Sequence, residues 1–373
     1  MTPGGHEVDF DRILVEELAK CGHTVEFLVP QGFKFSFDYK VPVHELAGQV
    51  VSYSGMTGLK KLLLSVKREV NRLSWYRQIY RLAQAKKYDA IIVPTSTYRY
   101  LRALAKSVLK KSPIPIVFIL HGINPTEAPK FLRAVQKLEK WPNIRPTVLN
   151  FTDNIFGVKR PNIRTIYPPT FIPRDINWQP QSQNLTDKTN LIIGFFGQYR
   201  REKHLEDFLD VYLQGNYNRP VQLLVQGATM HPEDSVDFER IIKKYQKHSE
   251  IEFLHKGLIG AEWQQAIANI DVLLLPYSAE RYRYHWGGML FTAIGFQKPV
   301  IVSDDMNPEV FAKFHIGERF KSGDQTALKT TLENFINHYD DNKTGYKAEL
   351  AKAAAEYSPA VFARQIESIC LAN

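Results

Sequence analysis

Short apolar runs rich in Val, Ile, Leu and Phe alternate with segments of helical hydrophobic period along almost the whole chain. Strands separated by helices predict a parallel sheet with helices on both faces, because one parallel strand reaches the next only through a crossover connection. The expected strands are 23–29, 88–94, 114–120 and 145–151 in the first half, and 191–197, 221–226, 251–253, 271–276 and 299–303 in the second. Since 373 residues exceed what one hydrophobic core usually sustains, the sequence favours an α/β protein of two domains.

The segment 167–190 separates the two halves. Four prolines and several Gln and Asn make it poor material for a helix or a central strand. We predict an N-terminal doubly wound, Rossmann-like domain at 1–172, a linker at 173–190, a second such domain at 191–356, and a C-terminal helix within 357–373.

The first residues, Met-Thr-Pro-Gly-Gly, run straight into an amphipathic helix with Phe10, Ile13 and Leu14 on one side. In a doubly wound domain a strand normally leads into the glycine turn and then the first helix. Gly4 and Gly5 resemble that turn without its strand. We therefore expect the reading frame to continue upstream of Met1 into a β-rich run; the alternative is a fold variant that lacks this strand.

Charge is unevenly distributed along the chain. The net charge is +9, yet the segment 58–111 holds fourteen Lys and Arg against Glu69 and Asp89, a local balance of +12. Such a segment favours an anionic partner, namely a membrane leaflet, a phosphorylated acceptor or nucleic acid, and the alternative is a solvated helix face. Because no apolar run approaches the roughly 18 residues of a spanning helix, we expect a cytoplasmic protein, peripheral at the inner face of the membrane if this segment binds a leaflet.

Metal-ligand patterns are lacking in the sequence. Cys21 and Cys370 stand far apart without His or Cys neighbours, which predicts neither a disulfide framework nor a zinc site. The one Asp-x-Asp pair, Asp9 and Asp11, falls in the first turn of a predicted helix, where it is interpreted as helix N-terminal charge. No metal or cofactor is expected.

A strand, a glycine turn and a helix follow one another at 192–212. The turn and the start of the helix contain Gly197, Gln198, Arg200 and Lys203. Backbone N–H groups at a helix start, the positive end of the helix dipole and adjacent cations together suit a diphosphate. The alternative is a strand–turn–helix with ordinary surface cations.

A second stretch runs from a strand ending at Pro276 through a loop to an apolar helix and the strand 299–303. The loop ends in Trp286, Gly287 and Gly288, and the helix carries Thr292.

These two stretches resemble the signatures of glycosyl transferases group 1, the large family 4-like group of retaining GT-B glycosyltransferases. Gly197 and Lys203 match the first signature, in which Gln198 replaces an Arg and His204 replaces a Gly. In the second signature Trp286 and Gly287 match the aromatic-Gly pair, and Thr292 replaces the second Glu of a paired-Glu motif.

The first Glu of that motif has two candidates. Counting from Pro276 gives Glu280, whereas counting back from Thr292 gives Tyr284, and the difference is a four-residue insertion, 281–284. We favour Glu280; a surface glutamate without a role is the alternative.

The resemblance implies a GT-B fold, two Rossmann-like domains with a cleft between them and a C-terminal helix that returns toward the first. It implies transfer, with retention and without a metal, from a nucleotide-diphosphate sugar to a glycan or lipid-linked acceptor in cell-surface polysaccharide biosynthesis. His121, at the carboxyl end of the strand 114–120, and Glu280 would be the catalytic sugar contacts. The expected donor contacts are Gly5, Gly197, Gln198, Arg200, Lys203, Trp286, Gly287, Gly288 and Thr292.

Three other functions are alternatives to glycosyl transfer. A non-catalytic protein on the same fold that binds a sugar nucleotide or glycan fits the incomplete Arg and Glu motifs. A sugar-nucleotide epimerase would need cleft acid and base residues that the sequence does not locate. Nucleic-acid binding through 58–111 lacks a recognition motif, so no nucleic-acid partner is expected.

Overall fold

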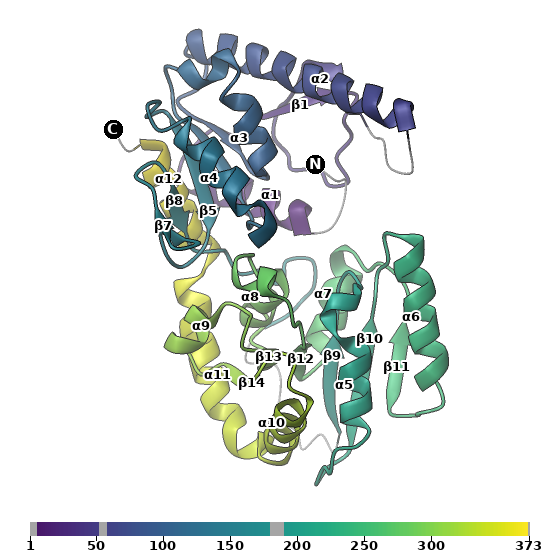
Figure 1. Cartoon of the computed structure of the whole chain (residues 1–373). Coiled ribbons are helices and arrows are strands. Elements are labelled where there is room, and N and C mark those ends of the chain that lie inside the picture. The colour runs from purple at the N-terminus through teal and green to yellow at the C-terminus, as the bar shows by residue number, and fades with distance from the viewer. Residues whose placement is uncertain (1–5, 52–57, 180–189, 372–373) are drawn as a thin grey trace. The chain divides into compact units, whose positions relative to one another are not determined.

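The computed structural model describes residues 6–51, 58–179 and 190–371, which form two compact units (Figure 1). Unit 1 comprises Met1–Pro168 and Pro359–Asn373, and unit 2 comprises Pro169–Ser358. The chain thus passes between the units at 168–169 and again at 358–359. Residues 173–179, expected in a linker, instead belong to unit 2, where the N–H groups of Arg174 and Asp175 donate to Gln264 Oε1 (2.8 Å each). The rest of the expected linker, 180–189, lies outside the described residues.

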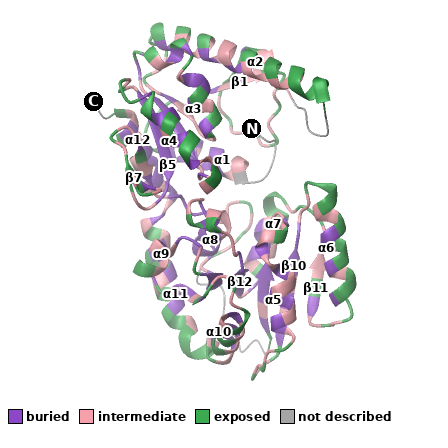
Figure 2. Ribbon diagram, viewed as in Figure 1, coloured by how far each residue is buried: buried purple, intermediate pink, exposed green. Residues whose placement is uncertain are grey.

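Unit 1 holds a four-stranded parallel sheet of order β3-β4-β5-β8 and a separate parallel pair, β1-β2. Its central strands β4 and β5 are buried throughout because helices cover the sheet, as Figure 2 shows. The elements are α1 (His6–Lys20), β1 (Phe27–Gln31), β2 (Val43–Gln49), α2 (Gly58–Gln84), β3 (Ile91–Val93), α3 (Tyr98–Leu104), η1 (Val108–Lys111), β4 (Ile116–Leu120), η2 (Pro125–Glu127), α4 (Ala128–Gln136), β5 (Ile144–Leu149), β6 (Asn154–Ile155), β7 (Val158–Lys159), β8 (Arg164–Ile166) and α12 (Pro359–Leu371).

The C-terminal helix α12 is part of the core of unit 1. Phe362 of α12 packs edge-on against Phe10 of α1, with ring centroids 5.4 Å apart. Arg145 of β5 donates a hydrogen bond to the carbonyl oxygen of Ile369. The end of the chain therefore completes the domain that its beginning forms.

Unit 2 holds one parallel sheet of order β11-β10-β9-β12-β13-β14. The order reverses between β9 and β12, and in doubly wound sheets ligands bind outside the carboxyl ends of the strands at such a switch point. The elements are β9 (Leu191–Phe195), η3 (Arg201–Lys203), α5 (Leu205–Tyr212), β10 (Val221–Gln226), α6 (Pro232–Tyr245), β11 (Ile251–Leu254), α7 (Gly260–Asn269), β12 (Val272–Leu275), η4 (Glu280–Arg283), α8 (Gly288–Gly295), β13 (Val300–Ser303), α9 (Pro308–Lys313), β14 (Gly317–Phe320), α10 (Gln325–Asn337) and α11 (Tyr339–Glu356).

The two-domain α/β fold expected from the sequence is confirmed. Each of the nine expected strands is present, with ends that shift by up to four residues. The strands β2, β8 and β14 and the short hairpin β6–β7 were not expected. Their sequences lack a long β-branched run; β2, for example, reads Val-His-Glu-Leu-Ala-Gly-Gln and is largely exposed.

Candidate active site

The switch point in unit 2 begins with the turn after β9. Gly197 adopts φ +104°, a left-handed conformation that favours glycine, and its N–H donates to Gln226 Oε1 (2.9 Å). A Cβ placed on Gly197 would lie 3.6 Å from Lys203 Nζ and 3.8 Å from Met289 Sδ. The glycine turn, the lysine and the start of α8 therefore converge on one place.

Lys203 is a buried lysine. Among the described residues its ammonium contacts two ring faces, at 4.6 Å from the Tyr277 centroid and 5.4 Å from the Phe195 centroid. Burial, reinforced by the nearby charges of Arg200 and Arg281, lowers the pKa of Lys203 to about 7. An anion that binds beside Lys203 would raise this lowered pKa again, because it favours the protonated, charged amine.

Two arginines share one carboxylate beside Lys203. Glu202 Oε1 lies 2.9 Å from an Arg281 guanidinium nitrogen and 3.7 Å from one of Arg200, and it accepts a hydrogen bond from Tyr282 (3.3 Å). Glu202 therefore ties η3, which follows β9, to η4, which follows β12. With Lys203, this arrangement brings two guanidinium groups, and one amine that a bound anion would protonate, close to one carboxylate.

The neighbouring His285 remains neutral. Burial first, and then Arg281 and Arg200, lower the pKa of His285 to about 4. Within the described part of the chain, His285 Nε2 and Arg281 Nε are buried without a hydrogen-bond partner. We call Gly197, Arg200, Glu202, Lys203, Arg281 and His285 the switch-point cluster.

The two glycines at the start of α8 donate hydrogen bonds within unit 2. Gly287 N–H donates to Asn307 Oδ1 (3.2 Å) and Gly288 N–H donates to the Trp286 carbonyl (2.9 Å), so a diphosphate would have to replace these bonds, and the expected donor contacts of the two glycines stay predictions. A Cβ on Gly287 would lie 2.5 Å from Asn307 Oδ1, which explains the need for glycine there. The positive end of the α8 dipole still lies beside Gly197.

The other predicted donor residues of unit 2 differ in exposure. Gln198 accepts a hydrogen bond from Arg200 (3.3 Å) next to the glycine turn. Trp286 is buried, with its ring stacked on Phe171 at 5.0 Å. Thr292 is buried in α8, where its hydroxyl donates to the Gly288 carbonyl (2.9 Å). Their contacts with a donor stay predictions.

The two predicted catalytic residues lie in different units. Glu280 is exposed at the start of η4, and Tyr284 is half-buried at its end. His121 follows β4 in unit 1, where it bonds to the Pro94 carbonyl (2.9 Å) and packs against Phe10 with ring centroids 4.4 Å apart. Gly5 lies outside the described residues.

The Asp-x-Asp pair lies in α1, as expected, but only Asp9 belongs to its first turn. Asp11 is buried, and burial followed by the charge of Glu7 raises its pKa to about 7. The interpretation of the pair as charge in the first turn of the helix therefore holds for Asp9 and is wrong for Asp11. Among the residues that the structure describes, no three His, Cys, Asp or Glu side chains form a metal-binding group.

Comparison with known proteins decides the family. The model of glycosyl transferases group 1 matches residues 177–357, and that of glycosyltransferase family 4 matches residues 12–168. The chain belongs to the family 4-like GT-B glycosyltransferases. Enzymes of this family move a sugar from a nucleotide donor. Family membership therefore favours glycosyl transfer over non-catalytic sugar binding and over epimerisation.

Solved structures with the same fold cover almost the whole glycosyltransferase chain. HepE from Anabaena, in complex with UDP and glucose, is 17% identical with a TM-score of 0.65 over 98% of this chain and 96% of its own. WaaG, a glycosyltransferase involved in lipopolysaccharide biosynthesis, is 14% identical with a TM-score of 0.64 over 100% and 98%. A glycosyltransferase from Rickettsia africae is 13% identical with a TM-score of 0.67 over 99% and 96%. A search of curated protein sequences finds no match.

The sequence did not single out Arg281, His285 or Asn307 as site residues. Arg281 and His285 lie in or beside the insertion 281–284, which family spacing treats as extra residues. Asn307 lies nineteen residues beyond Gly288, and only the fold brings it to the loop. The sequence offers one signal for Arg281. The insertion contains positive charge, and the first signature lacks its usual Arg, which Gln198 replaces.

Proposed function

We propose that the switch-point cluster binds the diphosphate of a nucleotide sugar and stabilises it as the leaving group. The observation that carries this proposal is the gathering of Arg200, Lys203 and Arg281 around one carboxylate at the carboxyl ends of β9 and β12. Cations and a helix N-terminus at that position suit a diphosphate. Arg281 supplies the positive charge that Gln198 lacks.

The chemistry follows from charge. Negative charge grows on the diphosphate as the bond to the sugar breaks, and fixed positive groups in a buried place stabilise it without reorganisation. Lys203 becomes protonated as the anion binds, because the anion favours the charged amine. We propose that the reaction proceeds with retention and without a metal, and that His121 and Glu280 contact the sugar.

The acceptor is a glycan or a lipid-linked glycan of a cell-surface polysaccharide. WaaG, a structural neighbour involved in lipopolysaccharide biosynthesis, supports this class of acceptor, and HepE, seen with UDP and glucose, supports a nucleotide-sugar donor. No helix among the described residues is long and apolar enough to cross a membrane.

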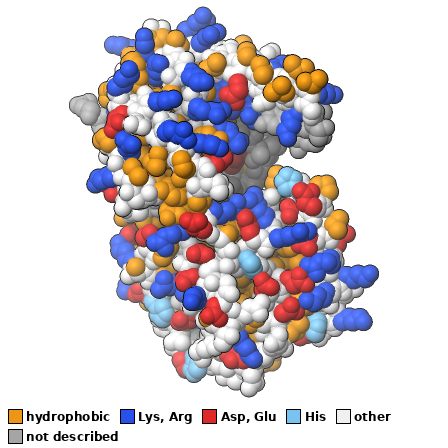
Figure 3. Space-filling view, in the orientation of Figure 1, with side chains coloured by type: hydrophobic (Ala, Val, Ile, Leu, Met, Phe, Trp, Pro, Cys, Tyr) orange, Lys and Arg blue, Asp and Glu red, His pale blue; other side chains and the backbone are white. Residues whose placement is uncertain are grey.

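We further propose that α2 holds the enzyme against an anionic leaflet. Five large apolar side chains of its first half are exposed, alongside exposed cations, as the upper part of Figure 3 shows. These apolar residues are Leu59, Leu62, Leu63, Val66 and Val70, and the exposed cations of α2 are Lys60, Lys61, Lys67, Arg77 and Arg81. An exposed apolar stripe with flanking cations is typical of helices that lie in a membrane interface.

A donor-hydrolysis assay tests the enzymatic proposal. Wild type should release UDP slowly from uridine diphosphate glucose in the presence of a metal chelator, and NMR should show α-glucose as the first product. Lys203→Met should lower the UDP affinity at least tenfold, whereas Lys247→Met, at an exposed lysine of unit 2, should leave it unchanged. An equal loss of UDP affinity in both variants would contradict the role of Lys203. Inhibition by the chelator would contradict metal independence, and β-glucose as the first product would contradict retention.

A further inference from the structure

The loop between β1 and β2 carries an aromatic residue at every second position. Phe33, Phe35, Phe37 and Tyr39 are half-buried, while the residues between them, such as Asp38 and Lys40, are exposed. This alternation is typical of a strand, yet the segment pairs with no strand among the described residues. Nothing in the donor chemistry uses these rings.

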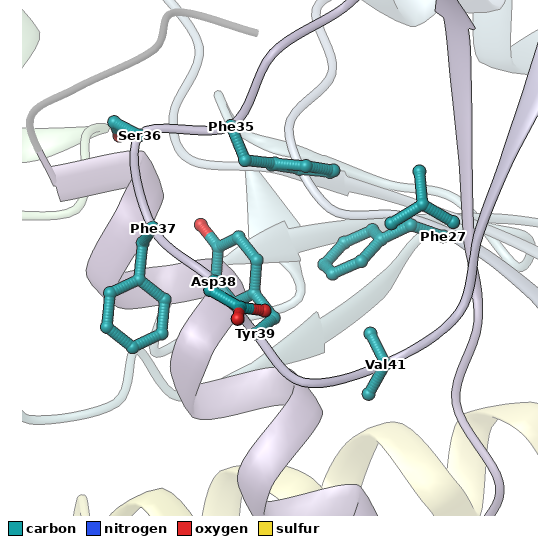
Figure 4. A pocket seen from close by; sticks show the side chains of 8 residues that line it. Phe27, Phe35, Ser36, Phe37, Asp38, Tyr39 and Val41 are labelled. Carbon is teal, nitrogen blue, oxygen red and sulfur yellow. The ribbon is translucent and has the colours of Figure 1, made fainter.

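The rings form a cluster of their own around Phe27 of β1. Phe27 lies 4.8 Å from Phe35 and 5.0 Å from Tyr39, and Phe37 lies 5.1 Å from Tyr39, measured between centroids. The cluster is separate from the main core of unit 1. Figure 4 shows the segment bent into an open loop with Phe35, Tyr39 and Phe27 turned toward its inside.

The loop surrounds a cavity of about 270 Å³. Its lining combines apolar side chains with a carboxylate and hydroxyl groups, and consists of Phe27, Phe35, Ser36, Phe37, Asp38, Tyr39, Val41 and Val43. Pockets for small ligands have this mixture of many apolar and few polar groups, and this volume suits a ligand of about one ring.

Charge restricts the chemistry of the occupant. Hydrogen bonds from Lys40 lower the pKa of Asp38, so this carboxyl is ionised at neutral pH. A hydrocarbon chain would desolvate that carboxylate without replacing its hydrogen bonds. A phosphate is disfavoured by Asp38 and by the acidic side chains Glu7 and Asp9 of α1 near Tyr39, although Lys40 and Arg12 offset part of that repulsion. A neutral ring with one apolar face and several hydroxyl groups satisfies both the aromatic faces and the carboxylate.

Helix α1 joins this loop to the strand end that carries His121. Tyr39 donates to the Val8 carbonyl (3.4 Å), and the Arg12 guanidinium lies 4.7 Å from the Phe37 centroid. Phe10, on the same helix, packs against His121. We infer that the aromatic loop of unit 1 binds a neutral pyranose ring of the acceptor glycan, an inference that rests on the proposed glycosyltransferase function.

Saturation-transfer NMR with methyl α-D-glucopyranoside as the probe tests this site. The matched variants are Phe37→Ala, which removes a lining ring, and Phe33→Ala, which removes a ring of the same loop that does not line the cavity. Wild type and Phe33→Ala should transfer saturation to the sugar protons, and Phe37→Ala and Asp38→Asn should reduce the transfer at least threefold. Saturating UDP should not displace the sugar, because the cavity lies outside the switch-point cluster.

The outcomes separate this inference from the donor proposal. Absence of transfer in wild type, equal transfer in Phe37→Ala, or stronger transfer to cyclohexanol than to the sugar would overturn the acceptor site while UDP binding persisted. If wild type failed to bind UDP while NMR saturation transfer to the sugar probe persisted, the donor proposal would be wrong and the acceptor site would stand.

Discussion

Lys203 makes the charge of the switch-point cluster depend on pH. Its pKa of about 7 lies below the ordinary lysine value, so the free protein loses this proton as the pH rises through 7. A bound diphosphate favours the charged amine, and binding above pH 7 must therefore take up a proton. We expect UDP affinity to fall between pH 7 and 9, by at most about tenfold per unit, a range in which the phosphate, with a second pKa near 6, stays ionised.

Calorimetry in buffers of different ionisation enthalpy measures this proton. Wild type at pH 8 should take up a substantial fraction of one proton per UDP, and Lys203→Met should take up none while binding weakly at every pH. His285, whose pKa is about 4, does not titrate in this range. Binding that is independent of pH in wild type would show that Lys203 does not face the diphosphate.

Thr292 bears on the choice of nucleotide. The Glu found here in the family can accept hydrogen bonds from both ribose hydroxyls, whereas the Thr292 hydroxyl already donates to Gly288 and offers only an uncharged acceptor. We expect wild type to bind thymidine diphosphate within about tenfold of uridine diphosphate, a difference of at most about 1.4 kcal/mol. Calorimetry on Thr292→Glu should show a larger preference for uridine diphosphate, and Thr292→Gln controls for side-chain size. A wild type that prefers the uridine nucleotide by more than tenfold contradicts the expectation.

At the level of elements, η4 presents two arginines with different surroundings. Arg281 is bound to Glu202 in the switch-point cluster, while Arg283 is exposed on the same short helix. A hydrogen bond to a charged group contributes about 1.5–3 kcal/mol, so Arg281→Ala should weaken UDP binding by roughly 10- to 150-fold. Arg283→Ala is the matched control and should bind UDP like wild type. Similar affinities for the two variants would exclude Arg281 from the donor site.

Helix α2 has two halves with different roles. Its second half packs against the rest of unit 1 through Tyr76 and Ala83. Arg72 is buried between Glu69 and the Tyr100 ring. Arg72 is therefore not one of the surface cations of the basic segment 58–111, whereas Leu62 and Leu63 in the first half are exposed to solvent.

Co-sedimentation with vesicles measures the contribution of this first half. Binding to phosphatidylserine vesicles should exceed binding to pure phosphatidylcholine, with each nearby cation contributing about 1 kcal/mol at low salt. Leu62→Asp/Leu63→Asp should reduce binding at least tenfold, and Lys60→Glu/Lys67→Glu should reduce it more than Arg77→Glu/Arg81→Glu. Equal partitioning into both vesicle types would count against a membrane role for α2.

The sequence located elements with strong local patterns and missed those that depend on distant partners. The strand of β9 and the turn at Gly197 follow from an apolar run and a glycine. The burial of Lys203 does not, because Tyr277 and Arg281 reach it from after β12, more than seventy residues later. The use of the Gly287 N–H likewise depends on Asn307, whose own backbone adopts φ +37°. Family spacing thus singled out Gly197 and Lys203 as candidates, whereas the burial and the pKa of Lys203 follow only from the tertiary structure.

At the scale of the whole molecule, the two units have separate cores. Phe118 and Phe131 are fully buried in unit 1, and Phe208 and Phe291 in unit 2, while the switch-point cluster lies entirely within unit 2. A ligand that binds one folded unit stabilises that unit by about 2.7 kcal/mol at 100 times its Kd. For domains of 150–250 residues, 1 kcal/mol shifts Tm by about 2–4 °C.

We therefore expect two thermal transitions in scanning calorimetry, of which UDP raises only that of unit 2, by about 5–11 °C at 100 times Kd. Substitutions in the core of each unit assign the transitions: Phe131→Leu should lower that of unit 1, and Phe208→Leu that of unit 2, because each removes buried apolar contacts. Lys203→Met should keep both transitions and lose most of the shift at the same UDP concentration. A single transition that moves as a whole with UDP would mean that the units unfold together, and an equal shift of two transitions would mean that UDP also binds unit 1.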